Sequence, residues 1–245
     1  DIVVLGRAAF DDDAVLAAAV ADAQAVLHFA GVNRAPDDEV EAANPAIATR
    51  LAAACRDAGV SPHIVYANSI HAVSDTPYGR AKRRAGKVLA ETAGLYTDLI
   101  LPHVFGEGAR PFYNNVTATL IAQILVDETP SINPEGRVQL LHAGVAAQAA
   151  IKAAVAGTSG RIEPVPRPIS VHELFERLKG FHESYQRNIF PDLSDSFYRD
   201  LFNAYRAATY PESWPRPLRL AEDNRGRLFE AVKGGGGGQT FLSTT

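Results

Sequence analysis

Short apolar runs alternate with longer Ala-rich segments up to about residue 155 of the chain. Each run is four to six residues long, which suits a strand, and the segments between the runs are long enough for helices. We expect strands at residues 2–5, 25–30, 64–68, 98–101 and 137–141, and helices at residues 13–23, 45–58, 78–93, 114–126 and 144–156. Because the runs are continuously apolar, they predict an α/β fold: a doubly wound parallel sheet with helices on both faces.

The sequence changes character after Gly157. Residues 171–187 and 195–207 read as amphipathic helices rich in aromatic side chains, which predicts a smaller, mostly helical C-terminal lobe. Three prolines then indicate a connector: Pro211, Pro215 and Pro217. The five glycines from Gly234 to Gly238 are either a flexible linker or a native loop. We expect three parts, at residues 1–160, 161–220 and 221–245, the last being the opening strands of a truncated further domain.

The composition, 47% apolar and 21% charged in 245 residues, is that of an ordinary globular protein. A net charge of −4 without a dense basic cluster argues against nucleic-acid binding. No apolar stretch reaches about 18 residues, so no membrane span is expected. The single cysteine, Cys55, excludes an intrachain disulfide and fits the cytoplasm. The chain lacks methionine and opens on an apolar run, so we expect it to be a piece of a longer protein.

Tyr78 and Lys82 are four residues apart in an expected helix and therefore project from the same face. A free tyrosine has a pKa of about 10, and a neighbouring ammonium lowers that pKa by favouring the phenolate. Ser69 ends the preceding apolar run and could offer its hydroxyl to the same substrate oxygen. These three residues predict carbonyl–alcohol redox chemistry, with Ser69, Tyr78 and Lys82 as catalytic residues. The alternative is an ordinary helix face beside a strand-end serine.

Three candidate site segments lie at the carboxyl ends of expected strands, at residues 30–34, 68–70 and 101–106. Ligands of an open α/β sheet bind outside the carboxyl ends of the strands, so we expect the site there. The seven histidines show no metal-ligand spacing, and we predict no metal. Ser69 also lacks the G-x-S-x-G elbow of a hydrolase nucleophile.

Residues 1–160 resemble the extended short-chain dehydrogenase/reductase family, also described as the NAD-dependent epimerase/dehydratase family. Residues 30–33 look like its glycine-containing turn beside the cofactor, and Ser69, Tyr78 and Lys82 match its catalytic triad. The resemblance implies a Rossmann-like fold and a nicotinamide cofactor, NADP or NAD. The expected cofactor-binding residues are Arg7, Ala30, Gly31, Asn33, Tyr78, Lys82 and Pro102.

Residues 101–106 resemble the family's R-P-x-N-V-[YF]-G segment near the nicotinamide, with Leu101 in place of the arginine and His103 in place of the asparagine. Arg7 follows the first expected strand, where a guanidinium can clasp a ribose 2′-phosphate. That position favours NADP, although a solvated loop arginine is an equal alternative. The family's G-x-x-G-x-x-G phosphate turn is expected before Asp1.

A narrower resemblance, to bacterial capsular-polysaccharide reductases, covers nearly the whole chain. It is carried by residues 30–34, 69–72, 77–79 and 110–119. Those enzymes act on a UDP-linked 4-keto-6-deoxy amino sugar, and a C-terminal cupin domain follows, whose opening strands residues 223–230 and 238–241 resemble. The expected substrate-binding residues are His103, Arg110, Asn114 and Asn115. Two adjacent asparagines that open a helix are equally common as caps.

The resemblance assigns a role to each member of the triad. Tyr78 would protonate the sugar O4 as hydride reaches C4, Ser69 would hydrogen-bond the carbonyl, and Lys82 would hold the nicotinamide ribose. We therefore predict an NAD(P)H-dependent reductase of a UDP-sugar for surface polysaccharide synthesis. The alternatives are a nucleotide-sugar 4-epimerase with tightly bound NAD and a non-catalytic dinucleotide sensor. A homodimer is also expected, since many relatives pair through the helix that carries the tyrosine.

Overall fold

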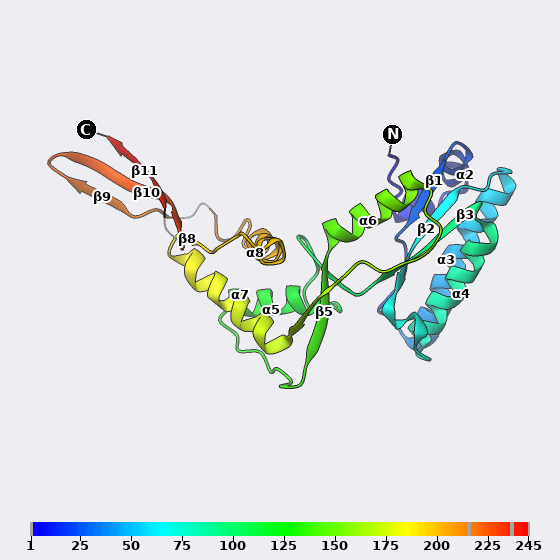
Figure 1. Cartoon of the computed structure of the whole chain (residues 1–245), viewed down its shortest axis with the longest axis horizontal. Coiled ribbons are helices and arrows are strands. Elements are labelled where there is room, and N and C mark those ends of the chain that lie inside the picture. Colours follow the sequence, from blue (N-terminus) through cyan, green and yellow to red (C-terminus); the bar gives the residue numbers. More distant parts are fainter. Residues whose placement is uncertain (1, 215–216, 236–237, 245) are drawn as a thin grey trace. The chain divides into compact units, whose positions relative to one another are not determined.

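The computed structural model describes residues 2–214, 217–235 and 238–244. They form two compact units: Asp1–Pro102 with Gly144–Val165, and His103–Ala143 with Pro166–Thr245 (Figure 1). The second unit therefore begins well before residue 160, where the sequence changes character. The reason is that the helix within residues 103–143 packs against helices that follow residue 170.

The first unit is built on a four-stranded parallel sheet. Its strands, in spatial order, are β1 (Ala25–His28), β2 (His63–Ser69), β3 (Leu95–Leu101) and β6 (Gly160–Ile162). The register places Tyr66 of β2 between His28 of β1 and Asp98 of β3. The parallel sheet predicted from the alternating apolar runs is confirmed.

Helices cover both faces of this sheet. They are α1 (Arg7–Phe10), α2 (Asp13–Ala21), α3 (Asp37–Asp57), η1 (Ile70–Val73), α4 (Pro77–Thr92) and α6 (Ala143–Ala156). Figure 1 shows α3 and α4 on one side of the strands and α6 on the other. Because side chains alternate along β2, Ile64 and Tyr66 pack with α2, α3 and α4, whereas Val65 packs with Ala150 and Ala153 of α6. The predicted doubly covered sheet is therefore observed.

Local signals fix where two of these helices begin. The Asp12 carboxylate caps α2 by accepting hydrogen bonds from two backbone amides of the first turn, at 2.9 and 3.1 Å. The Thr76 hydroxyl caps α4 by accepting a hydrogen bond from the Gly79 amide at 3.1 Å. Pro77 then opens α4, where its missing N–H sacrifices no helical hydrogen bond.

Two predictions for the N-terminal part were wrong. Residues 2–5 are not a strand: no other described strand pairs with them, and Val3 and Val4 are 74% and 86% exposed. An apolar run alone does not make a strand, because a strand needs a neighbour to bond with. Helix α3 begins at Asp37 instead of residue 45, and Pro45 lies inside it. The acidic residues of its first turn favour the earlier start because they complement the helix dipole.

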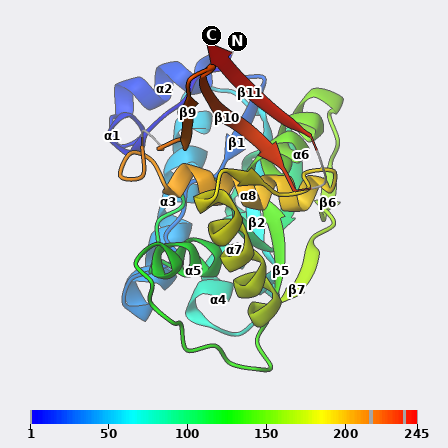
Figure 2. The same ribbon diagram turned by 90° about the vertical axis from the view of Figure 1, so that its left-hand side faces the viewer.

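The second unit has a three-stranded mixed sheet of β4 (His103–Phe105), β5 (Arg137–His142) and β7 (Arg167–Ser170), in that order. Strands β4 and β5 are parallel, whereas β5 and β7, side by side in Figure 2, are antiparallel. The strand predicted at residues 137–141 exists, but its partners place it here and not in the parallel sheet. Three helices share one aromatic-rich core with this sheet: α5 (Val116–Leu125), α7 (Val171–Gln186) and α8 (Ser196–Ala208).

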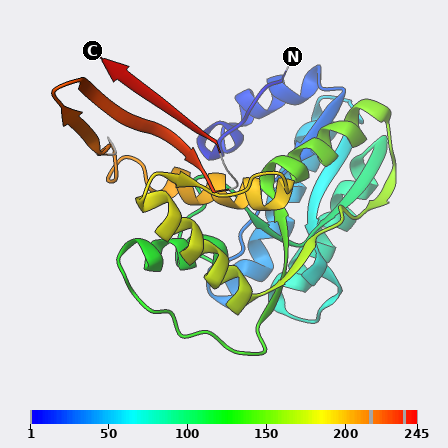
Figure 3. The ribbon, with the colours of Figure 1, turned by 60° about the vertical axis from the view of Figure 1, so that its left-hand side comes forward.

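The last part of the second unit is a group of four strands: β8 (Ile189–Phe190), β9 (Leu220–Asp223), β10 (Gly226–Gly234) and β11 (Gln239–Thr244). Strand β10 pairs antiparallel with β9 and β11, and β10 and β11 form the orange-to-red hairpin of Figure 3. The glycine run lies between them, with Gly236 and Gly237 outside the described residues, as is Pro215 of the expected connector. Strands were predicted here, and their assignment to a cupin domain stays a prediction.

Candidate active site

The carboxyl end of β2 leads directly into the residues predicted to be catalytic. Ser69 ends β2, and its hydroxyl accepts a hydrogen bond from the His71 amide at 3.1 Å, so it also caps η1. Tyr78 is the second residue of α4. Lys82 follows one turn later and is 5% exposed. A single strand–turn–helix segment therefore carries all three side chains.

Gly79 shows how tightly this segment folds back on itself. A β-carbon at position 79 would lie 2.4 Å from the Ser74 carbonyl oxygen and 2.5 Å from the His71 carbonyl oxygen. Both are backbone atoms, so any side chain here would force the turn apart. Glycine beside Tyr78 thus lets the first turn of α4 press against the loop that follows Ser69.

Tyr78 is half-buried, and its hydroxyl interacts with that of Ser69. Burial raises the pKa of the phenol, and the hydrogen bond with Ser69 lowers it by a smaller amount. The net pKa is above the ordinary value of 10, so the phenol is protonated at neutral pH. We predicted that Lys82 lowers this pKa, and that prediction was wrong, because the Lys82 side chain is directed into the sheet.

Lys82 reaches from α4 to the middle strand. Its Nζ donates a hydrogen bond to the Ala67 carbonyl oxygen at 2.6 Å and lies 4.2 Å from the centre of the Tyr66 ring. Burial lowers the pKa of Lys82 to about 8, against the opposing effect of the Asp98 carboxylate. At neutral pH Lys82 is therefore mostly charged, yet it releases its proton far more readily than a surface lysine.

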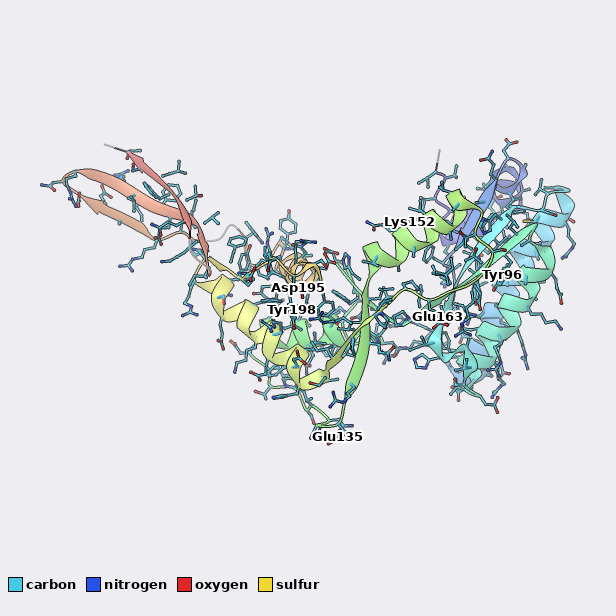
Figure 4. The ribbon with its side chains drawn as sticks, in the orientation of Figure 1. Tyr96, Glu135, Lys152, Glu163, Asp195 and Tyr198 are labelled. Atoms are coloured by element: carbon cyan, nitrogen blue, oxygen red, sulfur yellow. The ribbon has the colours of Figure 1, made fainter. Side chains whose placement is uncertain are left out.

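Polar side chains at alternate positions of three strands face α4 and form, with this lysine, what we term the Lys82 cluster: His28, Tyr66, Asn68, Lys82, Tyr96 and Asp98. The Asp98 carboxylate accepts hydrogen bonds from Asn68 Nδ2 at 2.8 Å and from the Tyr96 hydroxyl at 3.3 Å. Tyr96 of β3 is labelled in Figure 4. Sequence reasoning missed four of these residues: His28, Tyr66, Tyr96 and Asp98. The available signal was Asp98, a charge inside an apolar strand, where charges are rarely found.

The turn after β1 begins beside this cluster. His28 ends β1 and is 4% exposed; burial and the nearby Lys82 charge lower its pKa to about 4. Ala30 and Gly31 follow after Phe29 and are exposed. An exposed glycine turn at a strand end, close to a buried lysine, fits a bound dinucleotide, because backbone can approach the cofactor closely there.

Asn44 holds that turn from inside α3. Its Oδ1 accepts a hydrogen bond from the Val32 amide at 3.1 Å, and its Nδ2 donates to the Val32 carbonyl at 2.8 Å and the Val40 carbonyl at 3.2 Å. A β-carbon at Gly31 would lie 2.7 Å from Asn44 Oδ1. The glycine is therefore required for the turn to approach the asparagine that braces it.

The other predicted cofactor residues have different surroundings. Asn33 is exposed in the same turn, and Pro102 is half-buried directly after β3. Arg7 is exposed at the start of the four-residue α1. The strand expected just before Arg7 does not form, so the strand-end position that favoured NADP is not present.

The predicted substrate residues all belong to the second unit. His103 is half-buried in β4. Arg110 is exposed, and its guanidinium lies 5.1 Å from the centre of the Tyr113 ring. Asn114 has a left-handed backbone with φ of 51°, which asparagine tolerates better than most residues.

Asn115 is a helix cap, the alternative weighed from the sequence. Its Oδ1 accepts a hydrogen bond from the Ala118 amide at 3.0 Å, and its Nδ2 donates to the Val104 carbonyl of β4 at 3.1 Å. One side chain thereby fixes the start of α5 and joins it to the sheet.

The described ranges contain neither a metal-binding cluster nor a membrane-spanning helix. No group of three or more His, Cys, Asp or Glu side chains is arranged there to hold a metal ion. No helix in that part of the chain is both long enough and apolar enough to cross a membrane.

No protein-family model matches the chain. It is 29% identical over 228 residues to a Pseudomonas aeruginosa protein named UDP-2-acetamido-2,6-beta-L-arabino-hexul-4-ose reductase, covering 89% of this chain and 61% of that protein. It also matches the capsular polysaccharide assembling protein CapF of Staphylococcus aureus, with a TM-score of 0.72, 26% identity and coverage of 91% of this chain and 63% of that one. The chain is therefore similar in sequence to a nucleotide-sugar reductase and in fold to CapF.

A more distant member of the fold is the dTDP-glucose 4,6-dehydratase DesIV of Streptomyces venezuelae, as a double mutant. Its TM-score is 0.66 at 16% identity, with 84% of this chain and 79% of that chain covered. The chain thus has the predicted Rossmann-like fold. It spans 61% of the Pseudomonas protein and 63% of CapF, so both are considerably longer.

Proposed function

We propose that the chain is the reductase part of an enzyme that uses a nicotinamide dinucleotide to reduce a UDP-linked 4-keto-6-deoxy amino sugar for surface polysaccharide synthesis. The observation that carries the proposal is the Ser69–Tyr78 hydroxyl pair at the end of β2, one turn from buried Lys82. The names of the Pseudomonas and Staphylococcus relatives point to the same substrate class and pathway.

The protonation states suit a reduction. Tyr78 has a raised pKa and is a protonated acid at neutral pH, so it can give its proton to the carbonyl oxygen of the sugar. The Ser69 hydroxyl interacts with the Tyr78 hydroxyl and can also donate a hydrogen bond to the carbonyl oxygen of the sugar. A nicotinamide ring, when bound, supplies the hydride for the carbonyl carbon. Lys82, one turn along α4 from Tyr78, is the candidate to hold the nicotinamide ribose.

The cofactor would lie along the carboxyl ends of β1 to β3. Exposed Ala30, Gly31 and Asn33 offer backbone there, and Pro102 directly follows β3. The hydride donor is NADPH or NADH, and exposed Arg7 is the candidate contact of a 2′-phosphate if the donor is NADPH. For the nucleotide sugar we propose His103, Arg110, Asn114 and Asn115 in the second unit.

The direct test is a turnover assay with a UDP-4-keto-6-deoxy amino sugar and NADPH or NADH. The proposal expects reduced cofactor to be consumed in a one-to-one ratio with alcohol product, and Tyr78→Phe to abolish consumption. Conversion of a nucleotide sugar without added cofactor would instead identify the 4-epimerase. Dinucleotide binding with no turnover of any sugar would support the sensor and reject the reductase.

A further inference from the structure

Asp98 is a charged side chain in a strand that is otherwise part of the core. Its sequence neighbours Thr97 and Leu99 are 0% exposed, and Asp98 itself faces the α4 side of the sheet opposite Tyr66. A charge in such surroundings is costly unless other groups compensate it. None of the roles proposed above for the reaction uses this carboxylate.

Asp98 fixes the orientation of Asn68. An ionised carboxylate only accepts hydrogen bonds, so the group facing it at 2.8 Å must be the Asn68 amide nitrogen. The amide oxygen of Asn68 is then turned to the Ser69 backbone N–H, which donates to it at 2.9 Å. Tyr96 also holds this carboxylate, because its hydroxyl donates to the same oxygen, Asp98 Oδ1, at 3.3 Å. Asp98 therefore fixes the position of Ser69 through the Asn68 side chain.

Asp98 also lies close to Lys82: it is opposite Tyr66 in the register of β2 and β3, and Lys82 Nζ lies 4.2 Å from the centre of the Tyr66 ring. The Asp98 charge favours the ammonium form of the lysine. The titratable groups that interact with the lysine are His28 from β1, Tyr66 from β2 and Asp98 from β3. Tyr78 of α4 and Tyr96 of β3 are neighbours of Tyr66. Burial lowers the pKa of the histidine to about 4, and burial raises the pKa of each tyrosine. These four groups are therefore neutral near pH 7. Among the described members of the cluster, Asp98 is the one counter-charge to the lysine.

We propose that Asp98 is a positioning residue, which fixes Ser69 through Asn68 and keeps Lys82 in its ammonium form. The inference rests on the proposed function, because Ser69 and Lys82, the two residues on which Asp98 acts, have their roles in the proposed reaction. In this role Asp98 contacts neither the substrate nor the cofactor, and it acts on the reaction only through Ser69 and Lys82.

The test measures the titration of Lys82 directly. The chain has five lysines, so the side-chain ¹³Cε resonances of lysine-labelled protein can be followed against pH, with Lys82→Arg to assign the signal. Asp98→Asn removes the charge but keeps an oxygen that can accept from Asn68 and Tyr96. We expect the Lys82 pKa to fall by about 1 unit in this variant, the size expected for loss of a nearby opposite charge.

Two variants control the experiment. Asp98→Glu retains the charge and should keep the Lys82 titration close to that of the parent, while displacing Asn68 and lowering turnover. Glu91→Gln removes a carboxylate that is 66% exposed on the same helix as Lys82 and should change neither property. If Asp98→Asn does not fold, Asp98→Ser removes the same charge with a smaller side chain.

An unchanged Lys82 pKa in a folded, charge-free Asp98 variant would overturn the inference. Where the parent protein turns over, the alkaline limb of its pH profile should move to lower pH in Asp98→Asn, in step with the Lys82 resonance. A parent protein that reduces no nucleotide sugar while its Lys82 resonance still shifts would count against the proposed function, and would leave the coupling of Asp98 to Lys82 standing.

Discussion

The Nζ atom of Lys82 lies 4.2 Å from the centre of the ring of Tyr66, which belongs to β2, the strand that ends in Ser69. An aromatic face attracts a cation, and the attraction grows when water is excluded. Tyr66 is 1% exposed, so the lysine charge is stabilised by the ring, by the Ala67 carbonyl and by Asp98 in place of water. The same charge disfavours protonation of the neighbouring His28.

His28 should make the protein less stable in acid. Its pKa is about 4 when folded and 6.5 when exposed, so between these values the unfolded chain binds more protons than the folded one. Stability therefore rises with pH across this window and is lost as pH falls through it. Because His28 is 4% exposed, we expect about 3 kcal/mol of the free energy of unfolding to depend on it.

Chemical denaturation at several pH values between 4 and 6.5 measures this dependence, and His28→Asn should flatten it. The exposed His172 on α7 serves as the control, because His172→Asn should leave the slope as in the parent. Equal slopes in the parent and in His28→Asn would contradict the assignment.

Tyr78→Phe should reduce turnover by about 10²- to 10⁴-fold, the usual contribution of a general acid. Binding of reduced dinucleotide, followed by its fluorescence, should change little because the hydroxyl alone is removed. Ser69→Ala should also lower turnover. It should raise the pKa of Tyr78 further, since it deletes the hydrogen bond that lowers that pKa. Retention of full turnover by Tyr78→Phe would remove Tyr78 from the mechanism.

Gly86→Ala and Gly180→Ala should change stability in opposite directions. Both are helix glycines, and alanine generally favours a helix interior by about 0.5 to 1 kcal/mol. At Gly180 on α7 a β-carbon meets nothing within 4 Å, so the melting temperature should rise. At Gly86 on α4 it would lie 3.0 Å from the Tyr96 hydroxyl and 3.5 Å from the Tyr66 ring.

The crowding at Gly86 should displace Tyr96 from Asp98 and lower the melting temperature of Gly86→Ala. Calorimetry on the two variants and the parent gives the comparison. A rise of equal size in both would mean that Tyr96 moves away without cost and is not held by Asp98.

Asn44→Ala should be strongly destabilising for a single polar substitution. It removes three hydrogen bonds, two to the backbone of Val32 and one to the Val40 carbonyl. Because these backbone groups lose the partner that Asn44 provides, the free energy of unfolding should fall by about 2 to 4 kcal/mol. The exposed Asn133 makes one comparable bond, to the Glu135 amide, so Asn133→Ala is a matched control with a small effect. We also expect Asn44→Ala to weaken dinucleotide binding, because the turn at residues 31–33 loses its brace.

Local sequence signals predicted the elements whose boundaries are set locally. Asp12 and Thr76 cap α2 and α4 where the sequence indicated helix starts. The failures involve partners distant in sequence. Residues 2–5 lack a neighbouring strand among those described, and the strand at residues 137–141 found its partners in the second sheet.

The candidate site divides in the same way. Ser69, Tyr78 and Lys82 lie within one short segment, so their spacing alone indicated them. Asp98 and His28 reach the same place only through the sheet register, and no local pattern encodes which strand lies beside which. The pKa of Tyr78 was predicted in the wrong direction because burial, a property of the whole fold, raises it, and because the Lys82 side chain is directed to the Ala67 carbonyl.

The two-sided packing of β2 has a consequence for how this protein tolerates change. Slippage of that strand by a single residue would turn the Asn68 amide away from Asp98 and carry Tyr66 into the layer of α6. Insertions or deletions near residue 63 should therefore abolish folding and chemistry together. Such an insertion or deletion is not expected to give a folded but inactive protein, because β2 both packs in the core on two sides and carries the Ser69 hydroxyl.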